Sequence, residues 1–523
     1  MNKQYLNMVC NCKLVFFLVV VAIFSLLFVQ FSLNGKVFFP IDDVYIYFMQ
    51  AKNLHAGHFY TYSIGDQPVS SNTSLLYYFL SFLIWGLAGF ISDINRLEVI
   101  VYISYLINSI LLMIALITYR SILVMLYPDL KRVKILIFSA FSSPLVFFSF
   151  VNGLETGLTL TLLSLQLLLF LKGERIAFII LTILLSIHRP ENIVVNVAYA
   201  LIAIPFFSAF DAKKISLSFI VLLSVALTPL VNFIVTGDIR PASVARSHDA
   251  GFVDFLYVIW NNFFGILFIF PEWIPEYFEG VFKFVRYAFV IALIVFLSKR
   301  LFMNFNHIRR YLKDICLLRG VSNNNPQRGL AVIVVVTLSY VFLPLFFSAS
   351  TGEWGRYFSP VIPFLQIFLV TIFNLFFLKI LIVLNLILMP VYIVSYLNMT
   401  SNMYRLDKVG HFISKINSDK VVGLEVAGLM SHYAPGRVVD IYGLGTHRYM
   451  VSHGEYDKVY AELVKDNLDY IIVWESEEPR YYFDSSHAKD LYKNRLNKIM
   501  TLSIEPFMDF GHYPDISIYE IDK

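Results

Sequence analysis

Long apolar runs separated by short polar loops dominate the first 397 residues of the chain. A helix that crosses a bilayer needs about 20 mostly apolar residues. By that measure the pattern predicts spans at 14–33, 99–119, 134–150, 157–171, 176–189, 192–210, 215–235, 284–298, 330–349, 358–378 and 380–397. The predicted fold class is therefore an α-helical polytopic membrane protein with about 11 transmembrane helices.

Two further apolar stretches are harder to place. The segment 74–91 has no charge and is just long enough to span. The segment 252–281 is aromatic and is broken by Pro271 and Pro275 around Trp273, which predicts an interfacial helix and a turn at headgroup level.

Basic loops decide the direction of the helices, because Lys and Arg accumulate on the cytoplasmic side. Four such loops lie at 120–134, 172–175, 213–214 and 299–328. They share a side with Lys3 and Lys13 only if 74–91 does not cross. We therefore expect 74–91 to be interfacial or re-entrant, the N-terminus to be cytoplasmic and the C-terminus to lie outside.

The hydrophobicity falls sharply after Tyr396. We expect a transmembrane domain over 1–397, with a first outer loop at 34–98, and a separate domain over 398–523. Short apolar segments in the second domain predict strands at 421–424, 437–441, 469–474 and 516–521, and a helical pattern covers 456–465. The sequence thus predicts a small C-terminal α/β extracytoplasmic domain.

Composition and charge narrow the class of protein. The chain of 523 residues is 58% hydrophobic and 15% charged, which is too little charge for a soluble protein of this length. A net charge of +4 agrees with an excess of Lys and Arg in the loops of a membrane protein and gives no sign of nucleic-acid binding. The three cysteines are too few to form the disulfide framework of an extracellular protein, and they do not have the spacing of zinc ligands.

The first outer loop contains the adjacent carboxylates Asp42 and Asp43. They can simply cap the helix that follows, although one acidic residue would suffice for that. A glycosyl transfer needs a general base that takes the proton of the acceptor hydroxyl. Neighbouring helix positions point about 100° apart, so one Asp can face the acceptor while the other pairs or orients.

The other predicted outer loops contain further ionisable and hydrogen-bonding residues. Each taken singly is more often a cap or a surface ion pair, but as a set they predict an active site, because arginines on the outer face suit an anionic phosphate. The phosphate candidates are Arg189, Arg240, Arg246 and Arg356. The candidates for sugar or acceptor are Tyr45, Glu155, Glu191, His248 and Tyr357.

Several of these segments resemble a known family. They are Asp-Asp-Val-Tyr-Ile at 42–46, 51–58, Gln-Pro-Val at 67–69, Gly-Leu-Glu-Thr at 153–156, Arg-Pro-Glu at 189–191, Gly-Arg-Tyr at 355–357 and Asp-Ile-Tyr-Gly-Leu at 440–444. In this order they resemble the GT-C superfamily of membrane glycosyltransferases, and in particular bacterial proteins similar to the terminal β-arabinofuranosyltransferases of the actinobacterial cell wall.

The resemblance implies a GT-C membrane domain with interfacial helices in the first outer loop. It implies a polyprenyl-phosphate sugar donor, an inverting reaction and a base from the Asp42–Asp43 pair. Arg240 stands where relatives more often show an apolar residue, and Arg246 where a Lys is common, so arabinose specificity is not carried over.

The expected partners are the donor lipid, a cell-envelope glycan acceptor and the bilayer of a bacterial inner membrane, without nucleic acid. No cofactor is required by the sequence. The carboxylates allow a divalent cation, but no ligand spacing demands one.

Three other readings stay open. A lipid-linked sugar flippase or transporter would also have many helices, but the charges lie in predicted loops and no inverted repeat is evident. A glycan polymerase usually lacks a C-terminal domain such as 398–523. A non-catalytic scaffold would tolerate neutral residues at Asp42 and Asp43.

Overall fold

The computed structural model describes part of the chain. The described residues are 3–69, 74–92, 94–127, 129–189, 192–197, 199, 223–224, 226–237, 239, 333, 337, 359–372, 375–425, 427–441, 466–475, 496–502 and 515–521. Two compact units divide the chain. The first unit is Met1–Leu26, Tyr105–Leu227 and Asp249–Ser395, and the second unit is Leu27–Ser104, Thr228–His248 and Tyr396–Lys523.

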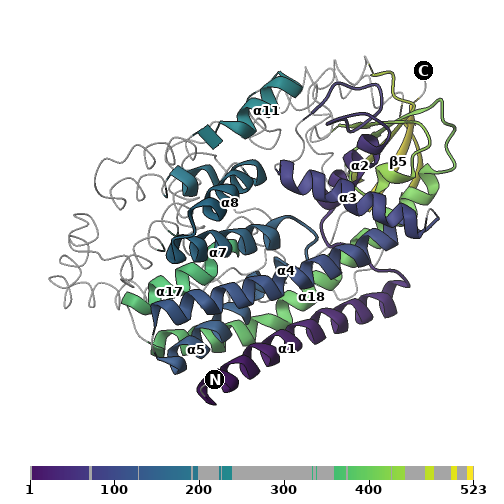
Figure 1. Cartoon of the computed structure of the whole chain (residues 1–523). Coiled ribbons are helices and arrows are strands. Elements are labelled where there is room, and N and C mark those ends of the chain that lie inside the picture. The colour runs from purple at the N-terminus through teal and green to yellow at the C-terminus, as the bar shows by residue number, and fades with distance from the viewer. Residues whose placement is uncertain are drawn as a thin grey trace, which may run out of the picture. The chain divides into compact units, whose positions relative to one another are not determined.

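Helices make up most of the described structure (Figure 1). They are α1 (Lys3–Asn34), α2 (Asp43–His55), α3 (Leu75–Ile91), α4 (Arg96–Leu126), α5 (Leu130–Phe141), α6 (Pro144–Phe148), α7 (Thr156–Lys172), α8 (Arg175–His188), α11 (Leu227–Thr236), α17 (Ile362–Ile372) and α18 (Leu375–Ile413), with 3₁₀ turns η2 (Ser359–Val361) and η3 (Met430–Tyr433).

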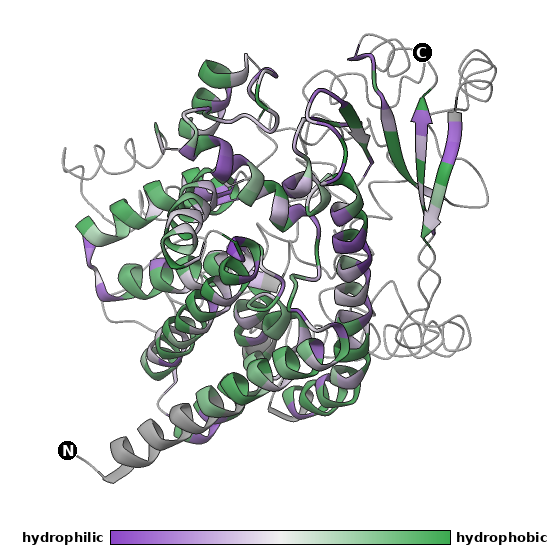
Figure 2. Ribbon diagram, turned by 90° about the vertical axis from the view of Figure 1, so that its right-hand side faces the viewer, coloured by the Kyte–Doolittle hydropathy of each residue, from purple (hydrophilic) through white to green (hydrophobic). Residues whose placement is uncertain are grey.

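Apolar residues cover most of the long helices, as the green ribbon of Figure 2 shows. Among the described helices, Arg96–Leu126 and Leu378–Ile413 are long and apolar enough to cross a membrane, and five shorter apolar helices accompany them. The segment 74–91, expected to be an interfacial or re-entrant helix, contains α3, a helix of 17 residues. The predicted segments 252–281 and 284–298, nearly all of 330–349 and much of 192–210 and 215–235 lie outside the described residues.

Several predicted spans were wrong in their bounds. The span predicted at 358–378 covers both the end of α17 at Ile372 and the start of α18 at Leu375. The span predicted at 134–150 is split, because α5 ends at Phe141 and α6 begins at Pro144, whose ring cannot continue a preceding helix. The span predicted at 380–397 does not stop there, because α18 runs on to Ile413.

The second unit contains a five-stranded sheet in the order β2-β1-β3-β5-β4. The strands are β1 (Val421–Leu424), β2 (Arg437–Asp440), β3 (Tyr470–Glu475), β4 (Leu496–Leu502) and β5 (Asp515–Ile521). The pairs of β1 with β2 and β3 are parallel, and the pairs of β5 with β3 and β4 are antiparallel. Four strands lie within one residue of the predicted segments, whereas β4 was not predicted.

Helices α2 and α3 pack together in the same unit. The Ser74 hydroxyl accepts the Tyr77 N–H at 2.9 Å and so begins α3. Nearly every side chain of α2 from Val44 to Ala51 is buried. The start of α2, which carries the Asp42–Asp43 pair, is therefore held in a rigid apolar setting.

Candidate functional site

Asp42 occupies the N-cap position of α2, but its side chain does not cap that helix. Its Oδ2 accepts the N–H of Gly428 at 2.6 Å, and its Oδ1 accepts the N–H of Leu429 at 2.8 Å. A side chain on Gly428 would overlap the Asp42 backbone and carboxylate, so only glycine fits this approach. We call this arrangement the Asp42 clasp, and it joins residue 42 to the segment just before η3.

Burial and hydrogen bonding in the Asp42 clasp act on the pKa of Asp42 in opposite directions. Burial raises the pKa of Asp42 to about 7, although the N–H bonds from Leu429 and Gly428 pull it down. The nearby carboxylates of Asp43 and Asp440 push the pKa of Asp42 further up. With a pKa of about 7, the Asp42 carboxyl gains and loses its proton near neutral pH.

Other contacts attach segment 59–66 to the same part of the second unit. The Tyr62 hydroxyl donates to the carbonyl oxygen of Ala427, and the Ser63 hydroxyl donates to the carbonyl oxygen of Val438. Arg437 Nη2 lies 2.6 Å from Asp66 Oδ1. The clasp is thus one of several contacts that fix the chain before α3 against β2 and the segment 427–429.

Tyr45 is almost fully buried, and its hydroxyl accepts the N–H of Phe39 at 3.1 Å. This bond braces the turn that leads into α2, and contact of Tyr45 with a sugar or acceptor stays a prediction. Asp43 is the first residue of α2 and is half-buried. Of the two adjacent carboxylates, only Asp42 gives both oxygens to Gly428 and Leu429.

A buried ion pair lies in the first unit where α7 begins and α8 ends. Arg189 Nη1 is 3.2 Å from Glu155 Oε1, and the two side chains are 4% and 6% exposed. Removing charges from water costs several kcal/mol per ion, so a buried pair is weak evidence for a stabilising role. An ionisable pair inside an apolar helix bundle is a candidate functional site.

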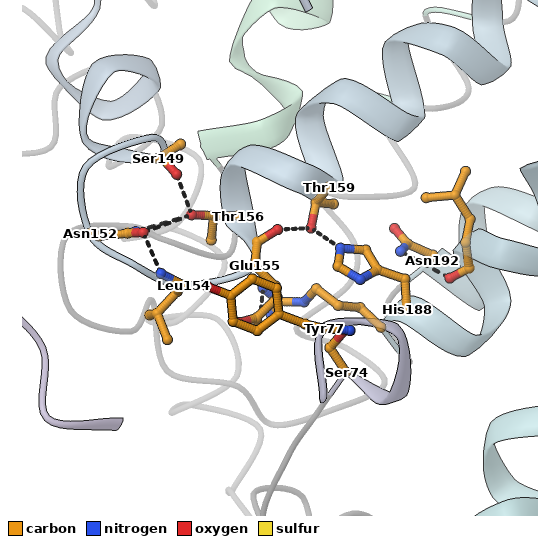
Figure 3. Close-up of polar contacts among 12 residues, drawn as sticks. Ser74, Tyr77, Ser149, Asn152, Leu154, Glu155, Thr156, Thr159, His188 and Asn192 are labelled. Carbon is orange, nitrogen blue, oxygen red and sulfur yellow. Dashed lines mark hydrogen bonds and ion pairs between the residues drawn. The ribbon is translucent and has the colours of Figure 1, made fainter. Parts of the chain in front are cut away.

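The ends of α7 and α8 are fixed next to this pair by a chain of hydrogen bonds (Figure 3). The Thr159 hydroxyl donates to the Glu155 carbonyl oxygen at 2.9 Å, so it accepts from His188 Nε2 at 2.8 Å. His188 is therefore the Nε2–H tautomer, and it is fully buried. The loop before α7 is held by Asn152, whose side-chain nitrogen lies 3.0 Å from the Thr156 hydroxyl.

A second polar cluster lies deeper between α7 and α8. Gln166 Nε2 donates to the Thr182 hydroxyl at 3.0 Å and to Asn196 Oδ1 at 2.9 Å. Asn196 Nδ2 in turn donates to the Ser186 hydroxyl at 2.7 Å. Such side-chain bonds hold apolar helices together where water is absent.

Six of the residues proposed from the sequence lie outside the described residues. They are Glu191, Arg240, Arg246, His248, Arg356 and Tyr357. Within the described part of the chain, no group of three or more His, Cys, Asp or Glu side chains is placed to hold a metal ion. The structure brings together Arg189 and Glu155, and separately fixes Asp42 beside Asp43.

Sequence reasoning missed three contributors to these sites. Gly428 and Leu429 contribute their backbone N–H groups, and the types of side chain in a sequence do not reveal such contacts. His188 was noted only as part of a loop, although a histidine at the end of an apolar run next to Arg189 is a readable signal for a buried polar contact.

Comparison with known proteins adds little to this picture. A family model described as a domain of unknown function (DUF8728) matches residues 397–519. No curated protein matches the chain. Among solved structures, the crystal structure of ArnT from Cupriavidus metallidurans bound to undecaprenyl phosphate is similar at a TM-score of 0.47 and 10% identity, over 96% of this chain and 97% of that one. The function of this chain has to be argued from its own residues.

Proposed function

We propose that the chain is a GT-C-like membrane glycosyltransferase that moves a sugar from a polyprenyl-phosphate donor to a cell-envelope glycan acceptor. The observation that supports the proposal is that Asp42, the neighbour of Asp43, accepts two backbone N–H groups. Both oxygens of Asp42 bind backbone N–H groups, which fixes the start of α2 and the position of its neighbour. A preorganised carboxylate is what a general base requires.

In this proposal Asp43 is the base and Asp42 is a positioning residue. Asp43 takes the proton of the acceptor hydroxyl while the acceptor oxygen bonds to the anomeric carbon. The bond between that carbon and the phosphate oxygen breaks, and its electron pair leaves with polyprenyl phosphate. Attack from the face opposite the leaving group inverts the anomeric configuration.

Arg189 supplies positive charge for the departing phosphate, and Glu155 holds the guanidinium in place before the donor arrives. Their distance of 3.2 Å and their burial support this role, because buried charges are retained at a cost that function can explain. Arg240, Arg246 and Arg356 are proposed phosphate ligands on the sequence alone, as are Glu191, His248 and Tyr357 for the sugar or acceptor.

The proposed location is a bacterial inner membrane, with many spans, a cytoplasmic N-terminus and residues 398–523 outside. The two long apolar helices Arg96–Leu126 and Leu378–Ile413 and the basic loops of the sequence support it. A lipid-linked sugar transporter or a glycan polymerase remains the alternative. A transporter needs no proton acceptor at position 43, so that residue separates the two classes.

The test is sugar transfer by the purified chain from a panel of synthetic short-chain polyprenyl-phosphate sugars, with water and simple glycans as acceptors. Release of polyprenyl phosphate from one donor, abolished in Asp43→Asn and retained in the exposed control Asp419→Asn, would support the enzyme. Lack of turnover with every donor, in a preparation that binds polyprenyl phosphate, would favour the transporter.

A further inference from the structure

A buried carboxylate near the end of α18 has no role in the proposed reaction so far. Asp407 belongs to the second unit and is 2% exposed. Its Oδ2 lies 2.9 Å from Nζ of Lys36, and its Oδ1 accepts the hydroxyl hydrogen of Tyr433. One carboxylate thus binds two segments that are far apart in the sequence.

The ring of Tyr433, the last residue of η3, packs closely against the same stretch of α18. A Cβ on Gly410 would overlap that ring, so the glycine allows the ring to approach the helix backbone. The His411 ring lies 5.0 Å from the Tyr433 ring between centroids, and His411 Nε2 lies 3.7 Å from Asp407 Oδ2. The packing of the ring and the hydrogen bond of the hydroxyl are therefore separable, because Tyr433→Phe removes the hydroxyl alone.

The two segments bound by this carboxylate are the two segments that form the Asp42 clasp. Lys36 lies shortly before Asp42, which accepts the hydrogen bonds of the clasp. Tyr433 lies shortly after Gly428 and Leu429, which donate them. The acceptor and the donors of the clasp are thus attached to α18 at one point.

A role in stability alone explains this arrangement poorly. The side chain of Asp407 is 3% exposed and that of Lys36 is 34% exposed, so the carboxylate has given up nearly all of its water. The loss of hydration often exceeds the gain from an ion pair, and a well-packed apolar side chain is often as stable in such a place. Hydrogen bonds from one carboxylate to two segments do fix the geometry of both.

We infer that Asp407 is a positioning residue that holds the Asp42 clasp, and through the clasp the proposed base Asp43, in place. The inference rests on the proposed function. Asp407 acts through Lys36 on one half of the clasp and through Tyr433 on the other half. Because Asp407 is not placed against donor or acceptor in this account, its loss should lower the rate of the chemical step and leave the binding of the donor unchanged.

The first experiment is hydrogen exchange followed by mass spectrometry on the purified full-length chain in detergent. The amides of Gly428 and Leu429 should exchange roughly three- to tenfold faster in Asp407→Asn and in Tyr433→Phe than in wild type, because each variant loses one of the bonds that hold the clasp. Peptides from β3 should exchange as in wild type, because the effect is local.

Two variants serve as controls for the exchange measurement. Lys36→Arg keeps a cation next to Asp407 and should match wild type. Asp419→Asn changes an exposed carboxylate of the same unit and should also match wild type.

A double variant shows whether Tyr433 acts through the clasp. The acceleration of amide exchange in Asp42→Asn combined with Tyr433→Phe should be smaller than the product of the two single effects, because both substitutions open the same contact. A contribution of Tyr433 to general stability would instead multiply with that of Asp42.

The second experiment is the transfer assay with an accepted polyprenyl-phosphate sugar. Tyr433→Phe and Asp407→Asn should lower kcat with the KM for the donor unchanged. Asp419→Asn should leave both constants at their wild-type values.

Three results would overturn the inference. One is wild-type exchange of the Gly428 and Leu429 amides in both Tyr433→Phe and Asp407→Asn. Another is an equal acceleration in the β3 peptides, which would assign Asp407 to general stability. The third is faster exchange of the two amides with an undiminished kcat. A chain that accepts no donor would contradict the proposed function, whereas the exchange measurement needs no turnover and decides by itself whether Asp407 holds the clasp.

Discussion

We expect Asp42→Asn to loosen the Asp42 clasp locally, because the substitution leaves one acceptor oxygen where the carboxylate has two. In Asp42→Asn the amide oxygen can still accept one N–H, but the amide nitrogen faces the other donor. A buried N–H left without its acceptor costs about 1–3 kcal/mol. Asp42 is partly buried, which admits some water, so we expect the lower half of that range. One to three kcal/mol corresponds to roughly 5- to 150-fold in an equilibrium constant.

The measurement is hydrogen exchange followed by mass spectrometry on peptides that contain Gly428 and Leu429. These amides should exchange several-fold faster in Asp42→Asn than in wild type, because the open state of the clasp is more populated. Asp43→Asn is the matched control and should leave the exchange of both amides unchanged. Equal exchange in wild type and Asp42→Asn, or equal acceleration in both variants, would refute the assignment of Asp42 as the positioning residue.

Three more predictions follow from the same contacts. Glu155→Gln should destabilise the first unit by about 3–5 kcal/mol, seen as a lower Tm in detergent, because it leaves Arg189 buried without its counter-charge; an unchanged Tm would argue against the ion pair. Gly428→Ala should cost about 1–3 kcal/mol and accelerate exchange in the clasp, since its Cβ would overlap Asp42; wild-type exchange would contradict this close approach. Folding raises the pKa of Asp42 from 3.8 to about 7, so its proton stabilises the folded state fully below pH 3.8, and this stabilisation is lost as the pH rises towards 7. In chemical denaturation, Asp42→Asn should therefore show a free energy of unfolding that falls less steeply with pH between 3.8 and 7 than that of wild type. An equal pH dependence in both proteins would contradict the raised pKa of Asp42.

The apolar pattern predicted much of the helical structure but misjudged several helix ends. Pro144 was a visible reason to split 134–150, and averaging over the apolar run hid it. The extension of α18 was hidden because 398–413 is polar on average. Its buried residues Met399, Met403, Leu406, Val409 and Ile413 nevertheless recur every three or four positions, which is helical spacing.

The sheet shows a similar limit. Strands β1, β2, β3 and β5 have compact apolar cores that a local pattern reveals, whereas β4 mixes polar and apolar residues and contains a register shift between Lys498 and Met500. A register shift of this kind also disturbs the regular pairing of the strand with its neighbour.

The candidate site was predictable only in its ionisable side chains. The Asp42–Asp43 pair and the Glu155–Arg189 pair could be singled out from the residue types. The bond between Asp42 and Gly428 could not, because the donor is a backbone group 386 residues away in the chain. The proposed division of roles between the two aspartates therefore rests on a contact that the sequence does not reveal.

The central claim is tested most directly by the initial rate of polyprenyl phosphate release from an accepted polyprenyl-phosphate sugar, compared between Asp43→Asn and Asp42→Asn. Loss of a general base typically lowers a rate by about 10²–10⁴-fold. The account predicts a loss of that size in Asp43→Asn, with the exchange of the Gly428 and Leu429 amides unchanged, and a smaller loss in Asp42→Asn that accompanies faster exchange. Full activity in Asp43→Asn, under conditions where wild type turns over, would contradict it.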